Sequence, residues 1–458
     1  MPQAPQIAFI AEPNLIFGSR FLRHFVPAEW RISMINKRYI KTAGAIIIAA
    51  VLLVSAGCGS RNNVPGSSAA DSSASGSSVQ AGSIVGNDKG STSVSTADVT
   101  LTRDSEYPDY YEQEVRETIK TLDNTITGDS VSYIFITDTH LDSNEASTTA
   151  AYRMYNAVVD VANNSDVDFV CVGGDIYDGR HAEENGKANA MQIIRNVAEI
   201  LSTCNKPVFF LHGNHDDNSF SAQVDGNLLY SADYIINKEE WYSVTMAYFP
   251  QYATEYEHGY FYYDLPGKNV RVVCLNMSDS DDTVVNGEQN EMGMYFYGYK
   301  DKQIDWLLDK AFARENCRYL IMSHDAFDYP EGYNVSSNRD TLHDILTAAY
   351  THQNYNNGRF AKDFSSWNSN IVLYNCGHLH MERVYMAPDM GGLPLINTDK
   401  GKVAEHGVWG TFGSNGYWCQ KPRTAGTITE ALFDIVVSKP GELDFVRFGA
   451  GDDWQVKY

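Results

Sequence analysis

The sequence is poor in cysteine and in basic residues, and none of its cysteines form a Cys-x-x-Cys pair. Seven cysteines among 458 residues, none at that spacing, argue against a zinc ribbon or a dithiol redox motif. The 35 Lys and Arg residues are outnumbered by 58 Asp and Glu residues, which gives a formal net charge of −23. Because nucleic-acid backbones attract basic surfaces, nucleic acid is not an expected partner.

No apolar run reaches the roughly 20 residues that a membrane-spanning helix needs. The longest run, residues 43–57, follows Lys37, Arg38 and Lys41 and ends just before Cys58. A basic segment, a short apolar segment and small residues are typical of a secretory signal peptide. The Ala-Gly-Cys ending resembles a bacterial lipoprotein signal, in which the cysteine is lipidated and becomes the mature N-terminus.

We therefore predict a lipoprotein signal peptide at residues 34–58, preceded by an upstream extension at residues 1–33 and lipidated at Cys58. An uncleaved anchor helix is the alternative. Residues 59–105 are mostly small and polar, so they predict a flexible linker that holds a domain away from a membrane. The expected location is extracytoplasmic and anchored to the bacterial cell membrane; a secreted protein is the alternative.

Residues 106–458 show no break in composition and are predicted to form one domain. Short apolar runs alternate with stretches of helical spacing, which predicts an α/β core. The predicted strands are Tyr133–Ile136, Phe169–Val172, Val208–Leu211, Val270–Leu275, Tyr319–Met322 and Ile371–Tyr374, and the predicted helices cover 147–163, 187–203, 303–310 and 339–350. Two β-rich runs around Lys439-Pro440-Gly441 predict a hairpin at 427–448.

Chemically active residues follow five of these strands. They are Asp138-Thr139-His140, Gly174-Asp175, Gly213-Asn214-His215-Asp216, Ser323-His324 and Gly377-His378-Leu379-His380. In open α/β sheets, ligands bind outside the carboxyl ends of the strands, so the five segments are expected to converge on one edge. Carboxylate, imidazole and amide ligands suit Mn, Fe or Zn. The glycines fit tight turns where a side chain would obstruct a metal or a substrate.

The ordered set D-x-H, G-D, G-N-H-D, H and G-H-x-H resembles the calcineurin-like metallophosphoesterases over roughly residues 130 to 385. The resemblance implies a four-layer α/β/β/α sandwich with two divalent metal ions. Carried over by position, one ion would be held by Asp138, His140, Asp175 and His380, and the other by Asp175, Asn214, His324 and His378.

The resemblance also implies a hydrolase acting on phosphoester bonds. A hydroxide that bridges the metals, formed as the pKa of water falls from about 15.7 toward ~7, would attack phosphorus. His215 would bind no metal and would protonate the leaving oxygen, and the carboxylate of Asp178 would orient it.

Other readings stay open. One alternative is an extracytoplasmic protein phosphatase, although the expected location counts against it. Another is a non-catalytic lipoprotein that binds a phosphorylated ligand, which would fit the anchor and linker as well. Among phosphoesters, diesters are favoured over monoesters. A monomer acting on a small-molecule phosphoester is expected. His212 could reach the site or serve the strand end, and His406 lies among glycines. The aromatic stretch 241–263 fits core packing better than a substrate platform.

Overall fold

The computed structural model describes most of the chain beyond residue 107. The described residues are 101, 107–142, 145–181, 185–219, 223–224, 227–228, 231–293, 298–325, 327, 338–402, 418–419 and 423–458. The chain divides into Met1–Gln80 and Ala81–Tyr458, and all described residues belong to the second unit. The predicted extension, signal peptide, Cys58, linker and His406 lie outside the described residues.

The first sheet has six strands in the order β20-β19-β18-β1-β2-β3. Its strands are β1 (Val131–Ile136), β2 (Phe169–Val172), β3 (Val208–Phe210), β18 (Leu432–Lys439), β19 (Glu442–Gly449) and β20 (Trp454–Lys457). β1, β2 and β3 run parallel, whereas β18 pairs antiparallel with β1 and forms a hairpin with β19. The hairpin predicted near the C-terminus is therefore confirmed.

The second sheet has eight strands in the order β17-β15-β16-β14-β11-β8-β7-β6. They are β6 (Thr254–Glu257), β7 (Tyr260–Asp264), β8 (Val270–Cys274), β11 (Arg318–Met322), β14 (Asn370–Cys376), β15 (Glu382–Ala387), β16 (Leu393–Asn397) and β17 (Trp418–Cys419). The central strands β8, β11, β14 and β16 are parallel, and the outer ones pair antiparallel. Two-stranded pieces are β4 (Gln223–Val224) with β5 (Asn227–Leu228), β9 (Val284–Val285) with β10 (Glu288–Gln289), and β12 (Asn354–Asn356) with β13 (Ala361–Asp363).

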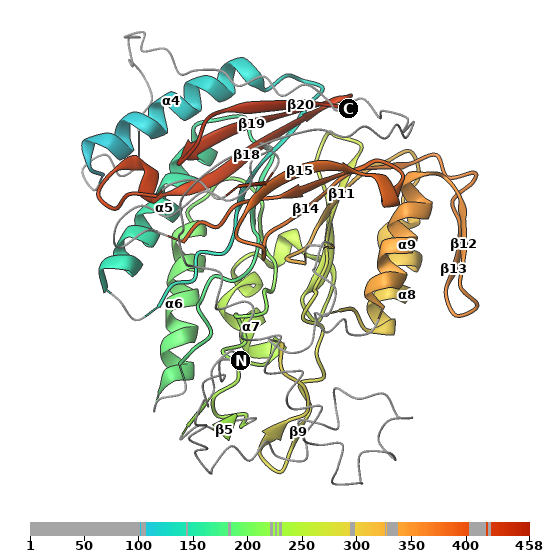
Figure 1. Ribbon diagram of the computed structural model, residues 1–458, viewed down its shortest axis with the longest axis horizontal. Coiled ribbons are helices and arrows are strands. Elements are labelled where there is room, and N and C mark those ends of the chain that lie inside the picture. Colours follow the sequence, from blue (N-terminus) through green and yellow to red (C-terminus); the bar gives the residue numbers. More distant parts are fainter. Residues whose placement is uncertain are drawn as a thin grey trace, which may run out of the picture. The chain divides into compact units, whose positions relative to one another are not determined.

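Helices cover the outer face of each sheet (Figure 1). The helices α4 (Asp109–Thr125), α5 (Glu145–Asn163) and α6 (Gly186–Leu201) lie on the first sheet, and α8 (Asp301–Asp309) and α9 (Arg339–Tyr350) on the second. The short α7 (Lys238–Val244) contacts α6. The four layers are helix, sheet, sheet and helix, so the predicted α/β/β/α sandwich is confirmed.

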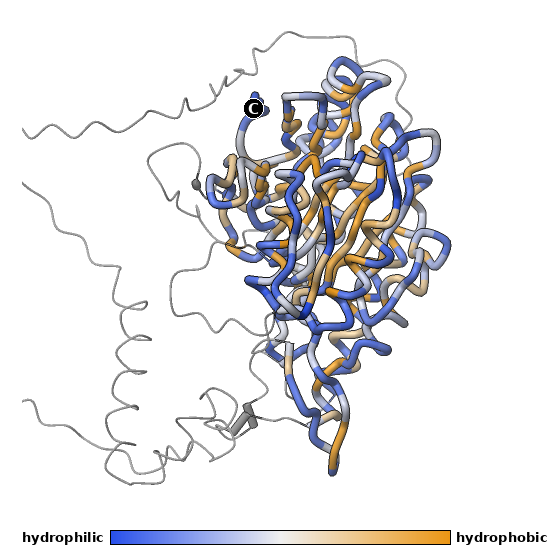
Figure 2. The backbone as a smooth tube through the Cα atoms, turned by 90° about the vertical axis from the view of Figure 1, so that its right-hand side faces the viewer, coloured by the Kyte–Doolittle hydropathy of each residue, from blue (hydrophilic) through white to orange (hydrophobic). Residues whose placement is uncertain are grey.

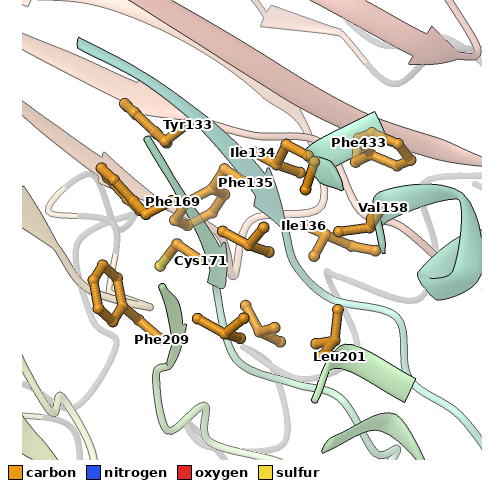
Figure 3. Packing of buried hydrophobic residues seen from close by; sticks show 14 of the residues in the cluster. Tyr133, Ile134, Phe135, Ile136, Val158, Phe169, Cys171, Leu201, Phe209 and Phe433 are labelled. Carbon is orange, nitrogen blue, oxygen red and sulfur yellow. The ribbon is translucent and has the colours of Figure 1, made fainter. Parts of the chain in front are cut away.

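The central strands read as continuous apolar runs because both of their faces are buried. On β8, Val272 and Cys274 join the core between the sheets, whereas Val273 packs under the outer helices. Hydrophobic residues gather along the strands and hydrophilic residues at the loops (Figure 2). Aromatic rings fill the core of the first sheet, where Tyr133 stacks on Phe169 with 4.9 Å between ring centroids (Figure 3).

Two parts of the fold were not anticipated from the sequence, the N-terminal helix α4 and the outer strands of the second sheet. The aromatic stretch 241–263 contains most of α7, all of β6 and the first part of β7. Trp241 and Phe261 in this stretch are buried in the core, which confirms packing as the main role of its aromatic residues. Within the described residues, no helix combines the length and apolarity needed to cross a bilayer.

Candidate metal centre

The strand ends of the two sheets meet at one edge, as the sequence predicted. Asp138 donates its backbone N–H to the carbonyl of Gly174 at 2.9 Å, which joins the ends of β1 and β2. The backbone N–H of His378, after β14 in the other sheet, donates to Asp138 Oδ2 at 2.9 Å. Backbone hydrogen bonds and a carboxylate therefore hold segments distant in sequence in contact.

Six of the predicted ligands form two groups whose donor atoms lie within 4.8 Å of one another. The first group is Asp138, His140, Asp175 and His380, and the second is Asp175, His324 and His378. Asp175 belongs to both. Asn214 is buried, and both of its chain neighbours contact the Asp175 carboxylate. Gly213 packs on this carboxylate, and the backbone N–H of His215 donates to Asp175 Oδ1 at 2.9 Å.

Most of these residues have an uncommon backbone conformation. Positive φ angles occur at Asp138 (54°), His140 (40°), Asp175 (51°), His378 (72°) and His380 (54°). Side chains with a Cβ are strained there, and Asp, Asn and His tolerate the region better than most residues. Such strain persists only where the surrounding structure over-determines it, and it clusters at functional sites.

The glycines of the motifs are required by space. A Cβ on Gly213 would collide with the Asp175 carboxylate, and one on Gly377 with Asp138. Gly174 has φ +94°, and its Cβ would lie 2.8 Å from His324 Nδ1. The backbone therefore approaches the site more closely than any other residue would allow.

The donor set fits divalent cations. Asp138 Oδ1 is fully buried and, among the described residues, receives no hydrogen bond. The nearest imidazole nitrogens are Nε2 of His380 at 3.2 Å, of His140 at 3.8 Å and of His324 at 3.9 Å. A buried carboxylate oxygen without a donor is costly unless a cation compensates it, and an ion among these nitrogens would do so.

The comparisons with known proteins agree with this geometry. The family model of calcineurin-like phosphoesterases matches residues 131–382, more than half of the chain. The chain belongs to this family. It is therefore a metal-dependent hydrolase of phosphoester bonds, and its two ligand groups indicate a centre of two divalent metal ions.

The solved structures that resemble this phosphoesterase include the following two. A dimetal phosphatase from Danio rerio is 15% identical, covers 72% of this chain and 99% of its own, and has a TM-score of 0.45. The Plasmodium protein GAP50, described as the anchor in the inner membrane complex, is 13% identical, covers 69% of this chain and 84% of its own, and has a TM-score of 0.35. No curated protein matches the chain.

The protonation states in the phosphoesterase centre suit metal binding. Burial lowers the pKa of His140 and of His378 to about 3, so both imidazoles are neutral at pH 7. Burial alone would raise the pKa of Asp175, but His324 and His215 outweigh it and keep that pKa well below its usual range. Burial also acts to lower the pKa of His324, yet the Asp175 and Asp138 carboxylates raise it to about 10. Neutral imidazoles and ionised carboxylates are the forms that ligate metals, and His324 must release a proton first.

His215 lies beside both ligand groups and belongs to neither. Its ring is edge-on to that of His140, with centroids 4.6 Å apart, and Nε2 lies 3.9 Å from Asp175 Oδ2. Nδ1 is 2.6 Å from the backbone carbonyl of Asp178. Since a carbonyl only accepts, Nδ1 carries the proton and Nε2 faces the centre.

Asp178 contacts His215 differently from the prediction, which assigned the contact to the carboxylate. The atom at 2.6 Å is the carbonyl oxygen, and the carboxylate oxygen Oδ1 lies 3.3 Å from Nε2 of His181. The side-chain identity at position 178 could not reveal a contact made by the backbone.

Asp216 caps the turns that carry the ligands. Its carboxylate accepts backbone N–H groups of Gly213 at 2.8 Å, Asp175 at 2.9 Å and Ile176 at 2.8 Å. Burial, and next the Asp175 carboxylate, raise the pKa of Asp216 to about 7. His212 is buried against Trp241 with ring centroids 4.8 Å apart, which favours its strand-end role.

One segment near the site was missed. Residues 398–402 follow β16, and Lys402 Nζ donates to the carbonyl of His140 at 3.1 Å. Residues 393–413 are strand-like with turns in the sequence, in agreement with β16, but the residue types do not indicate that Lys402 reaches His140.

Proposed function

We propose that the centre hydrolyses phosphodiesters in preference to phosphomonoesters. One ion would be held by Asp138, His140, Asp175 and His380, and the other by Asp175, Asn214, His324 and His378. The observation that carries this assignment is the shared carboxylate of Asp175, which belongs to both ligand groups. When bound, the two ions would supply a bridging hydroxide as nucleophile and neutralise charge on the phosphoryl oxygens.

His215 would act as the general acid in this reaction. Its Nε2 faces the centre, and the carbonyl of Asp178 fixes the ring by accepting the Nδ1 proton. A second proton on Nε2 would be delivered to the oxygen of the departing alcohol. The imidazole belongs to neither ligand group, so in this assignment Nε2 would carry a proton rather than bind a metal ion.

A charge balance supports the diester preference. Two divalent ions exceed the combined charge of Asp138, Asp175 and one hydroxide by a single positive charge. A diester carries one negative charge and balances it, whereas a monoester dianion leaves the buried centre with an excess. Uncompensated charge in a desolvated site is unfavourable.

A paired assay with the full chain tests the proposal. The chain is loaded separately with Mn, Fe or Zn, its metal content is measured, and kcat/KM is compared for bis(4-nitrophenyl) phosphate and 4-nitrophenyl phosphate. Two ions per chain and a higher value for the diester are expected. A higher value for the monoester would overturn the diester preference, and turnover of neither with any metal would favour a non-catalytic binding role.

We also propose that the phosphoesterase is extracytoplasmic and anchored to the bacterial cell membrane through lipidated Cys58. The basic, apolar and small-residue pattern of residues 34–58 supports this, as does the polar linker after it. Replacing Cys58 with Ser in a bacterial host should shift the protein from the detergent phase to the aqueous phase. An unchanged distribution would exclude lipidation at Cys58.

A further inference from the structure

The segment after β16 lies against the metal centre. β16 pairs parallel with β14, so its carboxyl end reaches the same edge as His378. Two backbone hydrogen bonds hold this segment in place, from Thr398 N–H to the carbonyl of Cys376 at 2.9 Å and from Gly401 N–H to that of Thr137 at 2.7 Å. A Cβ on Gly401 would lie 3.0 Å from Thr139 Cγ2, so the segment is pressed onto the end of β1.

Lys402 ends this segment with an ammonium group beside the centre. The group is partly buried and donates to the carbonyl of His140 at 3.1 Å. Burial raises the pKa of the Asp178 carboxyl, whereas the charges of His181 and, more weakly, Lys402 lower it. Lys402 is therefore close enough to influence Asp178.

Lys402 differs from several partly buried lysines of this acidic chain, which form ion pairs. They include Lys187 with Glu240 at 2.7 Å, Lys268 with Asp168 at 2.6 Å and Lys300 with Glu291 at 2.8 Å. Lys362 resembles Lys402, since it donates to the backbone carbonyl of Leu308 at 2.7 Å. Lys402 forms no ion pair with any residue that the structure describes; its contact there is a neutral carbonyl. A carbonyl uses one of the three N–H donors of the ammonium, which leaves donors for a further acceptor.

The position of Lys402 relates it to the leaving group. Both Lys402 and His215 adjoin His140, the lysine at its carbonyl and the histidine at its ring. Asp178 adjoins His215 as well, because its carbonyl accepts the Nδ1 proton of that ring. Lys402 and His215 are thus both neighbours of His140, a member of the first ligand group, and His215 is the residue that would meet the departing alcohol.

We propose that Lys402 binds a second anionic group carried by the leaving group, so that the substrates are phosphodiesters whose departing alcohol bears a carboxylate or a phosphate. This inference rests on the proposed function.

A matched pair of substrates tests it with the full, metal-loaded chain. Methyl 4-nitrophenyl phosphate and methyl 3-carboxy-4-nitrophenyl phosphate differ only in a carboxylate on the leaving group. The quantity measured is the ratio of kcat/KM for the carboxylated over the plain diester. Lys402→Ala should lower this ratio by about tenfold, the usual worth of a charge-assisted hydrogen bond, and Lys402→Arg should largely keep it.

Lys457→Ala is the control, because that lysine is exposed and pairs with Glu442 on the C-terminal hairpin. It should leave the ratio at the wild-type value. If Lys402 only fastens the His140 carbonyl, Lys402→Ala lowers kcat/KM for both diesters together, and a ratio within twofold of wild type overturns the proposal.

A binding measurement separates this inference from the proposed function. If the wild type hydrolyses neither diester, the proposed function fails. Calorimetry then measures the affinities of the chain for methyl phenylphosphonate and methyl 3-carboxyphenylphosphonate. Tighter binding of the carboxylated ligand that is lost in Lys402→Ala supports the anion site. Equal affinity of the two ligands in the wild type, or an equal loss for both in the variant, overturns it.

Discussion

The middle and the end of the same strand differ in almost every physical property. Along β1, residues Val131 to Ile136 are all buried, and their φ angles are ordinary for a strand. Two residues later, Asp138 combines full burial, a charge and a φ of 54°. β2 repeats the pattern, from Phe169–Val172 to Asp175. Residues that stabilise the core are therefore only two or three positions away from residues of the metal centre. Single substitutions should affect either the stability or the hydrolysis without affecting the other.

Removal of the metals should have the largest effect, and it should act on the strand ends alone. Chelation is expected to reduce hydrolysis to background, because the nucleophile depends on the ions. Circular dichroism should stay native, since the core does not contain the centre, and added Mn or Zn should restore turnover. Activity that persists in a chain shown to be metal-free would refute the dinuclear centre.

A substitution in the middle of β1 should lower the stability of the chain and leave hydrolysis unchanged. Ile134 is fully buried between β1 and the helices, so Ile134→Ala should lower the free energy of unfolding by about 2–5 kcal/mol. Urea denaturation measures this, and kcat/KM per folded molecule should stay within about twofold. A large loss of kcat/KM in the folded fraction would show that core and centre are coupled.

His215→Ala tests the proposed general acid while leaving the metal-ligating residues unchanged. Turnover should fall by about 100-fold or more, the range for a general acid, while two ions remain bound and unfolding is unchanged. His181→Ala serves as the comparison, because His181 contacts the Asp178 carboxylate rather than the centre; it should cost far less. Wild-type turnover in the His215 variant would remove this histidine from the reaction.

The smallest effect should come from relieving backbone strain. His380→Gly removes a side chain at φ 54° and should stabilise the metal-free chain by roughly 1 kcal/mol, although it weakens metal binding. His352→Gly is a matched control, since His352 has φ 53°, is exposed and follows the end of α9. The His352→Gly chain should be more stable than the wild type both with and without metal. The His380→Gly chain should be more stable only without metal. Equal gains in both variants would mean that His380 is not a ligand.

The sequence predicted the parts of the molecule where local pattern and global fold agree. An apolar run predicted β2 at Phe169–Val172, and helical spacing predicted α9 at 339–350. Both predictions match the structure, because each segment is bounded by turn residues or ligands. α4 was not predicted, although Tyr111, Val115, Ile119 and Leu122 recur at helical spacing on its buried face. The carbonyl of Asp178 and the position of Lys402 depend on backbone geometry and strand order, which residue types do not encode.

The left-handed backbone at the site has a consequence for how this phosphoesterase can diverge. Positions held at φ between 40° and 72° accept few amino acids without strain, chiefly Gly, Asn, Asp and His. Three of these four offer a donor atom to a metal. The main chain thus limits the substitutions tolerated at these positions to residues that mostly still coordinate cations. Exchanges between Asp, Asn and His can therefore change the metal preference without changing the fold.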